Sequence, residues 1–283
     1  MREIAYDDVV KSVKAMVMHT ATHLPQDALD ALKKAYEEEE SEVAKSVLKQ
    51  ILDNADLAAK EEKPLCQDTG LAVYFIKMGE DVRVAGGSIR DAINEATEQA
   101  YKDGYLRAST CECFDRHNLK EEVGYNLPAV IHFDIVKGDK IDIEYAAKGG
   151  GSENVSRATV LAPAQGKEGI KAYVKEVISN AGPNPCPPII VGVGIGGTFE
   201  VAAKSSKHAL FREAGTPNQN PELDAFEKEI LEELNKLGIG AMGMGGTKTV
   251  LAVHIEKNPC HIASLPVSVN VQCHSSRHSH ITL

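Results

Sequence analysis

Cysteine is the residue type in this sequence best suited to metal or redox chemistry, and three of the six cysteines lie in loop-like segments. Cys66 is in PLCQDTG, Cys186 in PNPCPPIIVGVGIGG and Cys273 in NVQCHSSRH, all rich in glycine, proline and polar residues. Loops at the ends of strands and helices are where a rigid scaffold presents side chains to a ligand. The intervals between these cysteines, 120 and 87 residues, are unlike the compact C-x-x-C spacing of ferredoxins and zinc ribbons. Spacing alone therefore leaves open that each thiol is simply a small buried side chain.

An ordered series of motifs runs through the chain. The segments are PLCQDTG, KGGGSEN, NPCPPIIVGVGIGGTFE, AVHIE, HIASLPV and QC-x-x-x-RH. From about residue 5 to the C-terminus, this series resembles the α subunit of class I fumarate hydratases and of the related tartrate dehydratases, which are iron–sulfur hydro-lyases. The resemblance implies a 4Fe-4S cluster held by Cys66, Cys186 and Cys273, with the fourth iron open to substrate.

Such a cluster would suit the hydration of a carbon–carbon double bond and its reverse. Hydroxide is a poor leaving group, and an open iron can act as a Lewis acid that draws charge from the leaving oxygen, an effect worth several kcal/mol. The substrate carboxylates and the developing carbanion also require cations and backbone donors.

The resemblance assigns substrate contacts to residues beside the first ligand and further along the chain. Gln67 and Asp68 are expected to contact substrate, with Asp68 taking part in proton transfer. Arg107 in YLRAST matches the family's carboxylate-binding arginine, and its planar fork suits bidentate binding. His261 in HIASLPV matches a family position near the substrate.

The glycine run at residues 149–151 is a further candidate anion site. Without side chains, such a run can bring backbone N–H groups close to an anion, and we expect Gly150 to contact substrate. Three cations could raise the local positive potential: Lys148, Arg277 and His278.

Each of these residues also has an ordinary structural interpretation. Asp68 could be a turn residue, the glycine run a plain turn, and His261 a structural hydrogen-bonding group. Arg107 could be a surface arginine, because Ala108 follows it where the family usually has proline.

Two cysteines in TCECFDRHN depart from the family pattern. We interpret Cys111 and Cys113 as residues without a role in the site, although extra redox-sensitive thiols or an adventitious metal site are alternatives. Cys260 lies beside His261, but the family match places the third ligand at Cys273.

The glycines Gly192, Gly194 and Gly197 satisfy G-x-G-x-x-G between an expected strand and helix, which could indicate a dinucleotide-binding fold. The acidic residue expected about 20 positions later, at the end of a second strand, is not in place, because Glu213 falls in or just after a helix. We interpret these glycines as positioning the Cys186 loop and opening the following helix.

The forms KGGGSEN and QCHSSRH favour fumarate as substrate, with a tartrate dehydratase-type activity on another hydroxy-dicarboxylate as the alternative. Full-length class I enzymes carry a second domain, and this sequence stops just after the third cysteine motif. The resemblance therefore implies a separate β subunit that completes the active site, in an α2β2 assembly. Two alternatives belong to other functional classes: an iron–sulfur sensor or electron carrier, and a nicotinamide dehydrogenase.

Composition excludes several functions. The net charge of −10, the absence of Trp and an aromatic content of 5% argue against a nucleic-acid-binding protein. No apolar run approaches the roughly 20 residues of a membrane span, and the N-terminus lacks the apolar stretch of a signal peptide. We expect a cytoplasmic protein.

The fold class expected from the elements is mixed α/β (α+β), with helices around a β-sheet and the cluster held by loops. We expect residues 1–283 to form one hydro-lyase α-subunit domain, with residues 1–62 mainly helical. Apolar periodicity predicts helices near residues 7–24, 25–60, 88–104, 169–182, 199–215 and 221–237. The Glu run at 37–40 is interpreted as a solvated helix face. Two β-rich runs flanking residues 137–140 predict a hairpin over 129–147.

Overall fold

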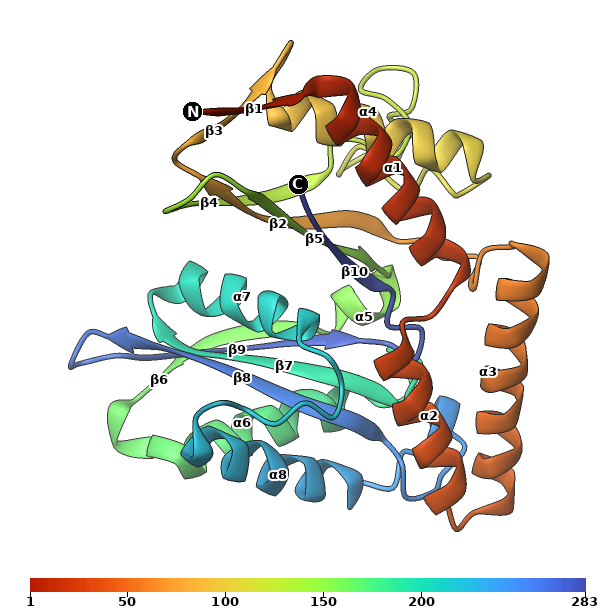
Figure 1. Cartoon of the computed structure of the whole chain (residues 1–283). Helices are drawn as coiled ribbons and strands as arrows, with labels where there is room; N and C mark the ends of the chain where they lie inside the picture. The colour runs from red at the N-terminus through yellow and green to blue at the C-terminus, as the bar shows by residue number, and fades with distance from the viewer. The chain divides into compact units, whose positions relative to one another are not determined.

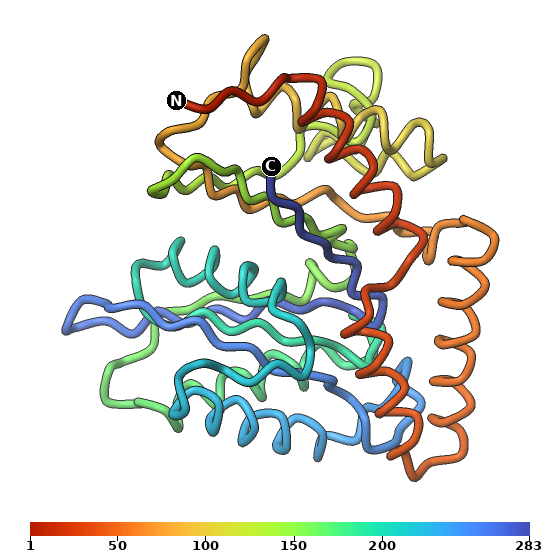
Figure 2. The backbone as a smooth tube through the Cα atoms, viewed as in Figure 1, coloured from red at the N-terminus to blue at the C-terminus, as the bar shows by residue number.

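The computed structural model describes the whole chain, which divides into two compact units (Figures 1 and 2). Unit 1 consists of Met1–Pro25, Ala55–Gly150 and Arg277–Leu283, and unit 2 of Gln26–Asn54 and Gly151–Ser276. Helices and sheets are mixed in the chain, which confirms the expected fold class. None of the helices combines the length and apolar character needed to cross a bilayer.

Unit 1 is built on a four-stranded sheet in the order β10-β5-β2-β4 (Figure 1). β2 pairs antiparallel with β5 and parallel with β4, and β10 pairs antiparallel with β5. The strands are β2 (Leu71–Gly79), β4 (Val130–Val136), β5 (Ile141–Lys148) and β10 (His278–Thr282). A smaller parallel pair is formed by β1 (Arg2–Ala5) and β3 (Val82–Ala85).

Two helices, α1 (Tyr6–Thr22) and α4 (Ile89–Asp103), pack against each other and form a core with this sheet. In α1 the buried residues recur at three- and four-residue spacing, for example Val9, Val13 and Met16. Ser88 is the N-cap of α4, and its side chain accepts a hydrogen bond from the N–H of Asp91. Both helices lie close to where the sequence predicts them.

The hairpin predicted over residues 129–147 is wrong. β4 and β5 each pair with β2, which lies between them. The connection at Lys137–Lys140 instead crosses the end of β2, where the N–H of Gly79 donates to the carbonyl of Lys140 at 2.8 Å. Most residues of β2 are buried, so the burial of this strand between two neighbours outweighs the local preference for a tight turn.

Unit 2 contains a second four-stranded sheet in the order β6-β9-β7-β8. In Figure 1, α7 covers one face of this sheet, and α6 and α8 cover the other. β7 pairs parallel with β8 and antiparallel with β9. The strands are β6 (Arg157–Leu161), β7 (Ile189–Gly197), β8 (Val250–Cys260) and β9 (Leu265–Gln272). The helices are α2 (Gln26–Glu38), α3 (Glu42–Glu61), α6 (Gly166–Ala181), α7 (Phe199–His208) and α8 (Pro221–Asn235). α3 continues beyond Asn54, where this stretch of unit 2 ends. A short helix, α5 (Gly150–Asn154), begins at Gly150, the last residue of the middle stretch of unit 1.

The glycines of the G-x-G-x-x-G pattern allow α7 to pack directly on β7. A Cβ on Gly192 would lie 2.1 Å from the carbonyl oxygen of Ser206, and one on Gly194 would lie 2.0 Å from that of Ala202. The alternating residues Val191, Val193 and Ile195 belong to the core that contains α6 and α8 residues. In this structure the glycines therefore serve helix–strand packing.

The single helix predicted over residues 25–60 is two helices, and the predicted solvated face is wrong at Glu39. Glu39 is 4% exposed, and its carboxylate accepts N–H groups from Ser41, Thr247 and Lys248. The break between α2 and α3 could not be predicted from the run of four glutamates, because nothing in its composition distinguishes Glu39 from its neighbours.

Candidate functional site

The segment Cys66–Gly70 of unit 1 leads directly into β2, and its fold is fixed by Asp68. One carboxylate oxygen of Asp68 accepts the N–H of Gly70 at 3.0 Å, and the other accepts the N–H of Gly150 at 2.7 Å. Leu71 and Lys148 are paired across β2 and β5, which brings the glycine run next to Asp68. The N–H of Gly150 thus positions Asp68 in this structure.

Buried polar groups hold the same segment from behind. The Tyr101 hydroxyl lies 3.1 Å from the carbonyl of Thr69 and 3.0 Å from that of Gly70, and can donate to either. Burial raises the pKa of Tyr101, so the hydroxyl keeps its proton. The Thr69 hydroxyl accepts the N–H of Arg107 at 2.9 Å, which ties the segment after α4 to the Asp68 loop.

An open cavity of about 420 Å³ in unit 1 brings together three of the residues assigned to substrate by resemblance, Gln67, Asp68 and Arg107. They are separated by up to 40 positions in the sequence. Gln67 and Asp68 lie just before β2 and Arg107 lies just after α4, and these two segments meet at the cavity. The remaining lining residues are Ala108, Ser109, Cys111, Arg116 and Asn118.

Arg277 is a buried cation close to Asp68. It is 1% exposed, and its Nε and Nη1 have no hydrogen-bond partner. A Cβ placed on Gly149 would lie 3.2 Å from Asp68 Oδ2 and 3.9 Å from Arg277 Nη2, so both groups flank the glycine run. A buried guanidinium without partners is costly and favours an anion nearby.

Cys186 and Cys273 lie at the same end of the unit 2 sheet. Cys186 precedes β7 and Cys273 follows β9, and these strands pair antiparallel with Ile190 opposite Gln272. His274 joins the two segments: its backbone N–H donates to the Cys186 carbonyl at 3.2 Å, and its Nδ1 donates to the same oxygen at 3.0 Å. Cys186 has φ +55, a left-handed conformation that is costly for this residue and is found preferentially at functional sites.

His261 lies in the turn between β8 and β9, at the opposite end of β9 from Cys273. The eight residues of β9 span seven steps of about 3.3 Å, so its two ends are roughly 23 Å apart. His261 is exposed, and its neighbour Ile262 is 92% exposed. Within unit 2, the structure does not bring His261 to the Cys273 loop.

The cavity includes two residues to which sequence reasoning gave no role. Cys111, interpreted as a residue without a role, lines it, whereas Cys113 does not. Arg116, in the same TCECFDRHN segment, also lines the cavity, and the sequence alone predicts no role for it. The only indication in the sequence was that a second arginine follows Arg107 by nine residues. An irregular loop has no periodicity, so the sequence could not show that the Arg116 side chain lies at the same cavity.

The chemistry of the three thiols fits an iron–sulfur group. Cys66, Cys186 and Cys273 are partly exposed and form no disulfide, and all lie in loops that hydrogen bonds hold in place. Within each unit, no group of three or more His, Cys, Asp or Glu side chains is arranged around a single metal ion. Soft thiolates in loops, each able to bind a separate iron, suit a cluster better than one hard cation.

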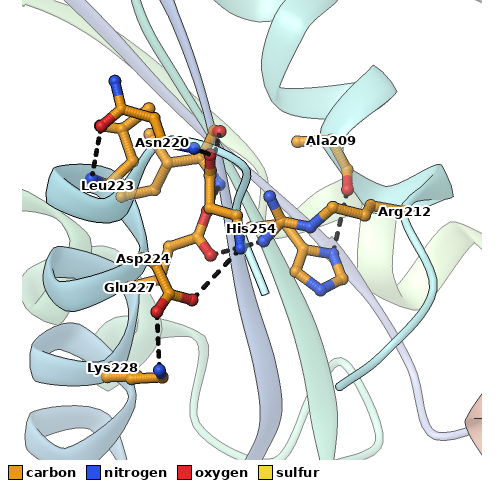
Figure 3. Close-up of polar contacts among 10 residues, drawn as sticks. Ala209, Arg212, Asn220, Leu223, Asp224, Glu227, Lys228 and His254 are labelled. Atoms are coloured by element: carbon orange, nitrogen blue, oxygen red, sulfur yellow. Dashed lines mark hydrogen bonds and ion pairs between the residues drawn. The ribbon is translucent and has the colours of Figure 1, made fainter. Parts of the chain in front are cut away.

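A polar cluster around the AVHIE segment of unit 2 is structural (Figure 3). Glu227 on α8 is 5% exposed; it accepts the N–H of Ile255 at 2.7 Å and pairs with Arg212. The buried His254 lies 3.1 Å from the carbonyl of Ala209 through Nδ1, which must be the donor. These contacts attach α8 and the segment after α7 to β8.

Comparison with known proteins gives a consistent result. Residues 10–282 match the model of the family described as fumarate hydratase (Fumerase). The chain is 44% identical over 267 residues to the putative L(+)-tartrate dehydratase subunit alpha of Methanocaldococcus jannaschii, covering 94% of each chain. It is 34% identical over 270 residues to the L(+)-tartrate dehydratase subunit alpha of Escherichia coli K12, covering 95% of this chain and 88% of the relative.

Proposed function

The chain belongs to the fumarate hydratase (Fumerase) family of hydro-lyases, and from this we propose that it is the cluster-binding α subunit of an L(+)-tartrate dehydratase. The forms KGGGSEN and QCHSSRH favour fumarate, but both relatives described above are named for L(+)-tartrate, so tartrate replaces fumarate as the proposed substrate. Hydration of fumarate to L-malate is the second candidate, supported by the description of the family model.

The observation that carries the proposal is the cavity lined by Gln67, Asp68 and Arg107, the first two of which directly follow Cys66 in the sequence. Removal of water from a vicinal dihydroxy-dicarboxylate requires a carboxylate-binding cation and a proton acceptor beside the reacting carbons. Arg107 supplies the cation, and its fork can hold one carboxylate through two hydrogen bonds. The Gln67 amide, at the same cavity, can orient a hydroxyl or carboxylate oxygen.

Asp68 is the proposed site of proton transfer. Its two oxygens are fixed by N–H groups from Gly70 and Gly150, so the carboxylate is oriented before substrate arrives. A positioned carboxylate of this kind contributes about 10²- to 10⁴-fold to a proton-transfer step.

Cys66, Cys186 and Cys273 would hold a 4Fe-4S cluster. When bound, the cluster would supply an open iron that polarises the leaving hydroxyl group.

His261 is proposed to contribute to the site of a second copy of the chain. Its separation of roughly 23 Å from the end of β9 places it away from its own Cys273 loop, whereas its exposed turn, with Ile262, is available for contact with another molecule. This arrangement fits the expected α2β2 assembly with a separate β subunit completing the site, a partner also indicated by the word "subunit" in the names of the relatives. We propose that the assembly works in the cytoplasm.

The test is anaerobic co-expression with a candidate β subunit, followed by assays of both reactions. We expect a brown complex that forms oxaloacetate from L(+)-tartrate faster than it forms fumarate from L-malate. Faster release of fumarate would establish the second candidate, and activity of the α chain alone would contradict completion of the site by a partner.

The ligand assignment is tested by Cys186→Ser, with Cys260→Ser as the matched control. Cys186→Ser should lose iron and the visible absorbance of the cluster, while Cys260→Ser should keep both. Full iron content in Cys186→Ser would remove Cys186 from the ligand set.

A further inference from the structure

The arginines of this chain fall into two groups. Five have a partner: Arg83 and Arg212 pair with glutamates, Arg2 and Arg157 donate to backbone carbonyls, and Arg90 lies over the Phe133 ring. The side chains of the other three have no hydrogen bond, ion pair or aromatic contact: Arg107, Arg116 and Arg277.

All three of these arginines are found around Asp68. Arg107 and Arg116 line the same cavity as Asp68, and Arg277 flanks the adjoining glycine run. In a chain with a net charge of −10, unpaired guanidinium groups gathered at one carboxylate indicate a place where anions bind.

The cavity itself has an excess of positive charge. Its lining contains one carboxylate, that of Asp68, and two guanidinium groups, those of Arg107 and Arg116. Asp68 already accepts two backbone N–H groups. Both guanidinium forks are therefore available to an incoming dianion.

The loop that carries Arg116 is held on both sides of it. Glu112 accepts the N–H groups of Phe114 at 2.6 Å and Asp115 at 2.9 Å, contacts that, with the Cys113 thiol, lower the pKa of Glu112 to about 2. His117 lies between Asp115 and Glu122, with its Nε2 3.0 Å from the Glu122 carboxylate. Arg116 itself has φ +65, a conformation that an arginine adopts only when its neighbours impose it.

We propose that Arg116 binds one substrate carboxylate while Arg107 binds the other, so that this cavity selects dianionic hydroxy-dicarboxylates. The proposal rests on the hydro-lyase function proposed above and adds a specificity-determining residue to that site. Arg107 and Arg116 each hold one of the two carboxylates, and Gln67 and Asp68 face the carbon atoms and hydroxyl groups between them.

The first experiment measures steady-state kinetics of the α–β complex. Arg116→Asn is the main variant, because asparagine tolerates the left-handed backbone and its short side chain removes the guanidinium group. We expect KM for the preferred dicarboxylate to rise about 10- to 100-fold with kcat nearly unchanged, as loss of a charged hydrogen bond implies. Arg116→Lys should restore part of the affinity. Arg83→Ala, which removes a guanidinium elsewhere in unit 1, should leave both constants unchanged.

The second experiment does not depend on turnover. Cys111 lines the cavity and Cys113 does not, so iodoacetamide modification of the two thiols can be compared within one peptide by fragment-ion mass spectrometry. L(+)-tartrate, fumarate or L-malate should slow modification of Cys111 but not of Cys113, and monomethyl succinate should protect far less. Arg116→Asn should require about 10- to 100-fold more dicarboxylate for the same protection.

The two proposals fail in different ways. If wild-type complex releases no oxaloacetate from L(+)-tartrate, the proposed substrate is wrong, and the role of Arg116 is still tested with whichever dicarboxylate protects Cys111. Unchanged KM and unchanged protection in Arg116→Asn, or no protection of wild-type Cys111 by any dicarboxylate, would overturn the role of Arg116.

Discussion

Asp68 shows how a single residue can be fixed for chemistry by backbone alone. Both of its oxygens accept N–H groups from glycines, Gly70 within its own loop and Gly150 from the far end of β5. The motif PLCQDTG identifies the residue, but the contact with Gly150 depends on the antiparallel register of β2 and β5, which no local pattern specifies.

Asp68→Asn is predicted to retain iron and lose turnover. An amide has one acceptor oxygen, so one of the two N–H contacts is lost and the proton acceptor is removed. We expect kcat to fall about 10²- to 10⁴-fold, measured beside iron content, with the exposed Asp103→Asn as control. An unchanged rate would exclude Asp68 from proton transfer.

Arg277→Met is predicted to separate stability from function. Replacing a buried, unpaired guanidinium by an apolar side chain of similar length removes a desolvation cost, so the cluster-free variant should be at least as stable as wild type, by up to about 4 kcal/mol. Anion binding should weaken at the same time. The urea midpoint of the cluster-free protein and dicarboxylate protection of Cys111 measure the two effects, and a lower midpoint would show that Arg277 stabilises the fold.

At the scale of elements, strong apolar periodicity predicted where helices lie, but the sequence did not predict which strands pair with one another. The helices at residues 88–104 and 221–237 are found as α4 and α8, each with a side-chain cap at its start. The hairpin over 129–147 failed because β2, distant in sequence, inserts between β4 and β5. The prediction of one helix over 25–60 was wrong because the chain leaves the helix at Glu39, whose buried carboxylate binds groups that include Thr247, more than 200 residues away.

Gly194→Ala tests the interpretation of the glycine pattern. The added methyl group would meet the backbone of α7 at 2.0 Å, so helix and strand must separate. We expect a loss of about 3 kcal/mol in the free energy of unfolding, measured by urea denaturation. Unchanged stability with loss of nicotinamide dinucleotide binding would instead support the dinucleotide-binding interpretation.

Glu39→Gln tests the connection between α2 and the start of β8. Burial raises the pKa of Glu39, but the N–H groups of Ser41, Thr247, Lys248 and Glu40 outweigh it and hold the pKa below its ordinary value of 4.5. The carboxylate therefore stabilises unit 2 above about pH 4.5, and this contribution is lost as pH falls through the lower, folded-state pKa.

Glu39→Gln should consequently cost about 2 kcal/mol at pH 7 and less at pH 3. Urea midpoints at the two pH values measure the difference, with Glu37→Gln, which has no such contacts, as the control. The same loss at both pH values would mean that the charge of Glu39 is not what matters.

At the scale of the whole molecule, the chain passes between the two units four times. Unit 1 is assembled from three separate stretches, and strand β10 of its four-stranded sheet comes from the last of them. The division into two compact units could not be predicted from sequence, because apolar patterning does not report which distant stretches assemble together.

Deletion of residues 278–283 is predicted to act on unit 1 alone. The deletion exposes the edge of β5, so amides of β5 and β2 should exchange hydrogen faster, while those of β7 and β9 keep their protection. Hydrogen-exchange mass spectrometry resolves the strands separately. Equal loss of protection in both sheets would show that the two units unfold together.

The late position of β10 has a consequence during protein synthesis. On the ribosome, β2, β4 and β5 emerge long before residues 278–282 have been translated, and for that time β5 has an unpaired edge. An open strand edge is a template for other polypeptides. The nascent chain is therefore expected to need chaperone protection until translation reaches its final strand.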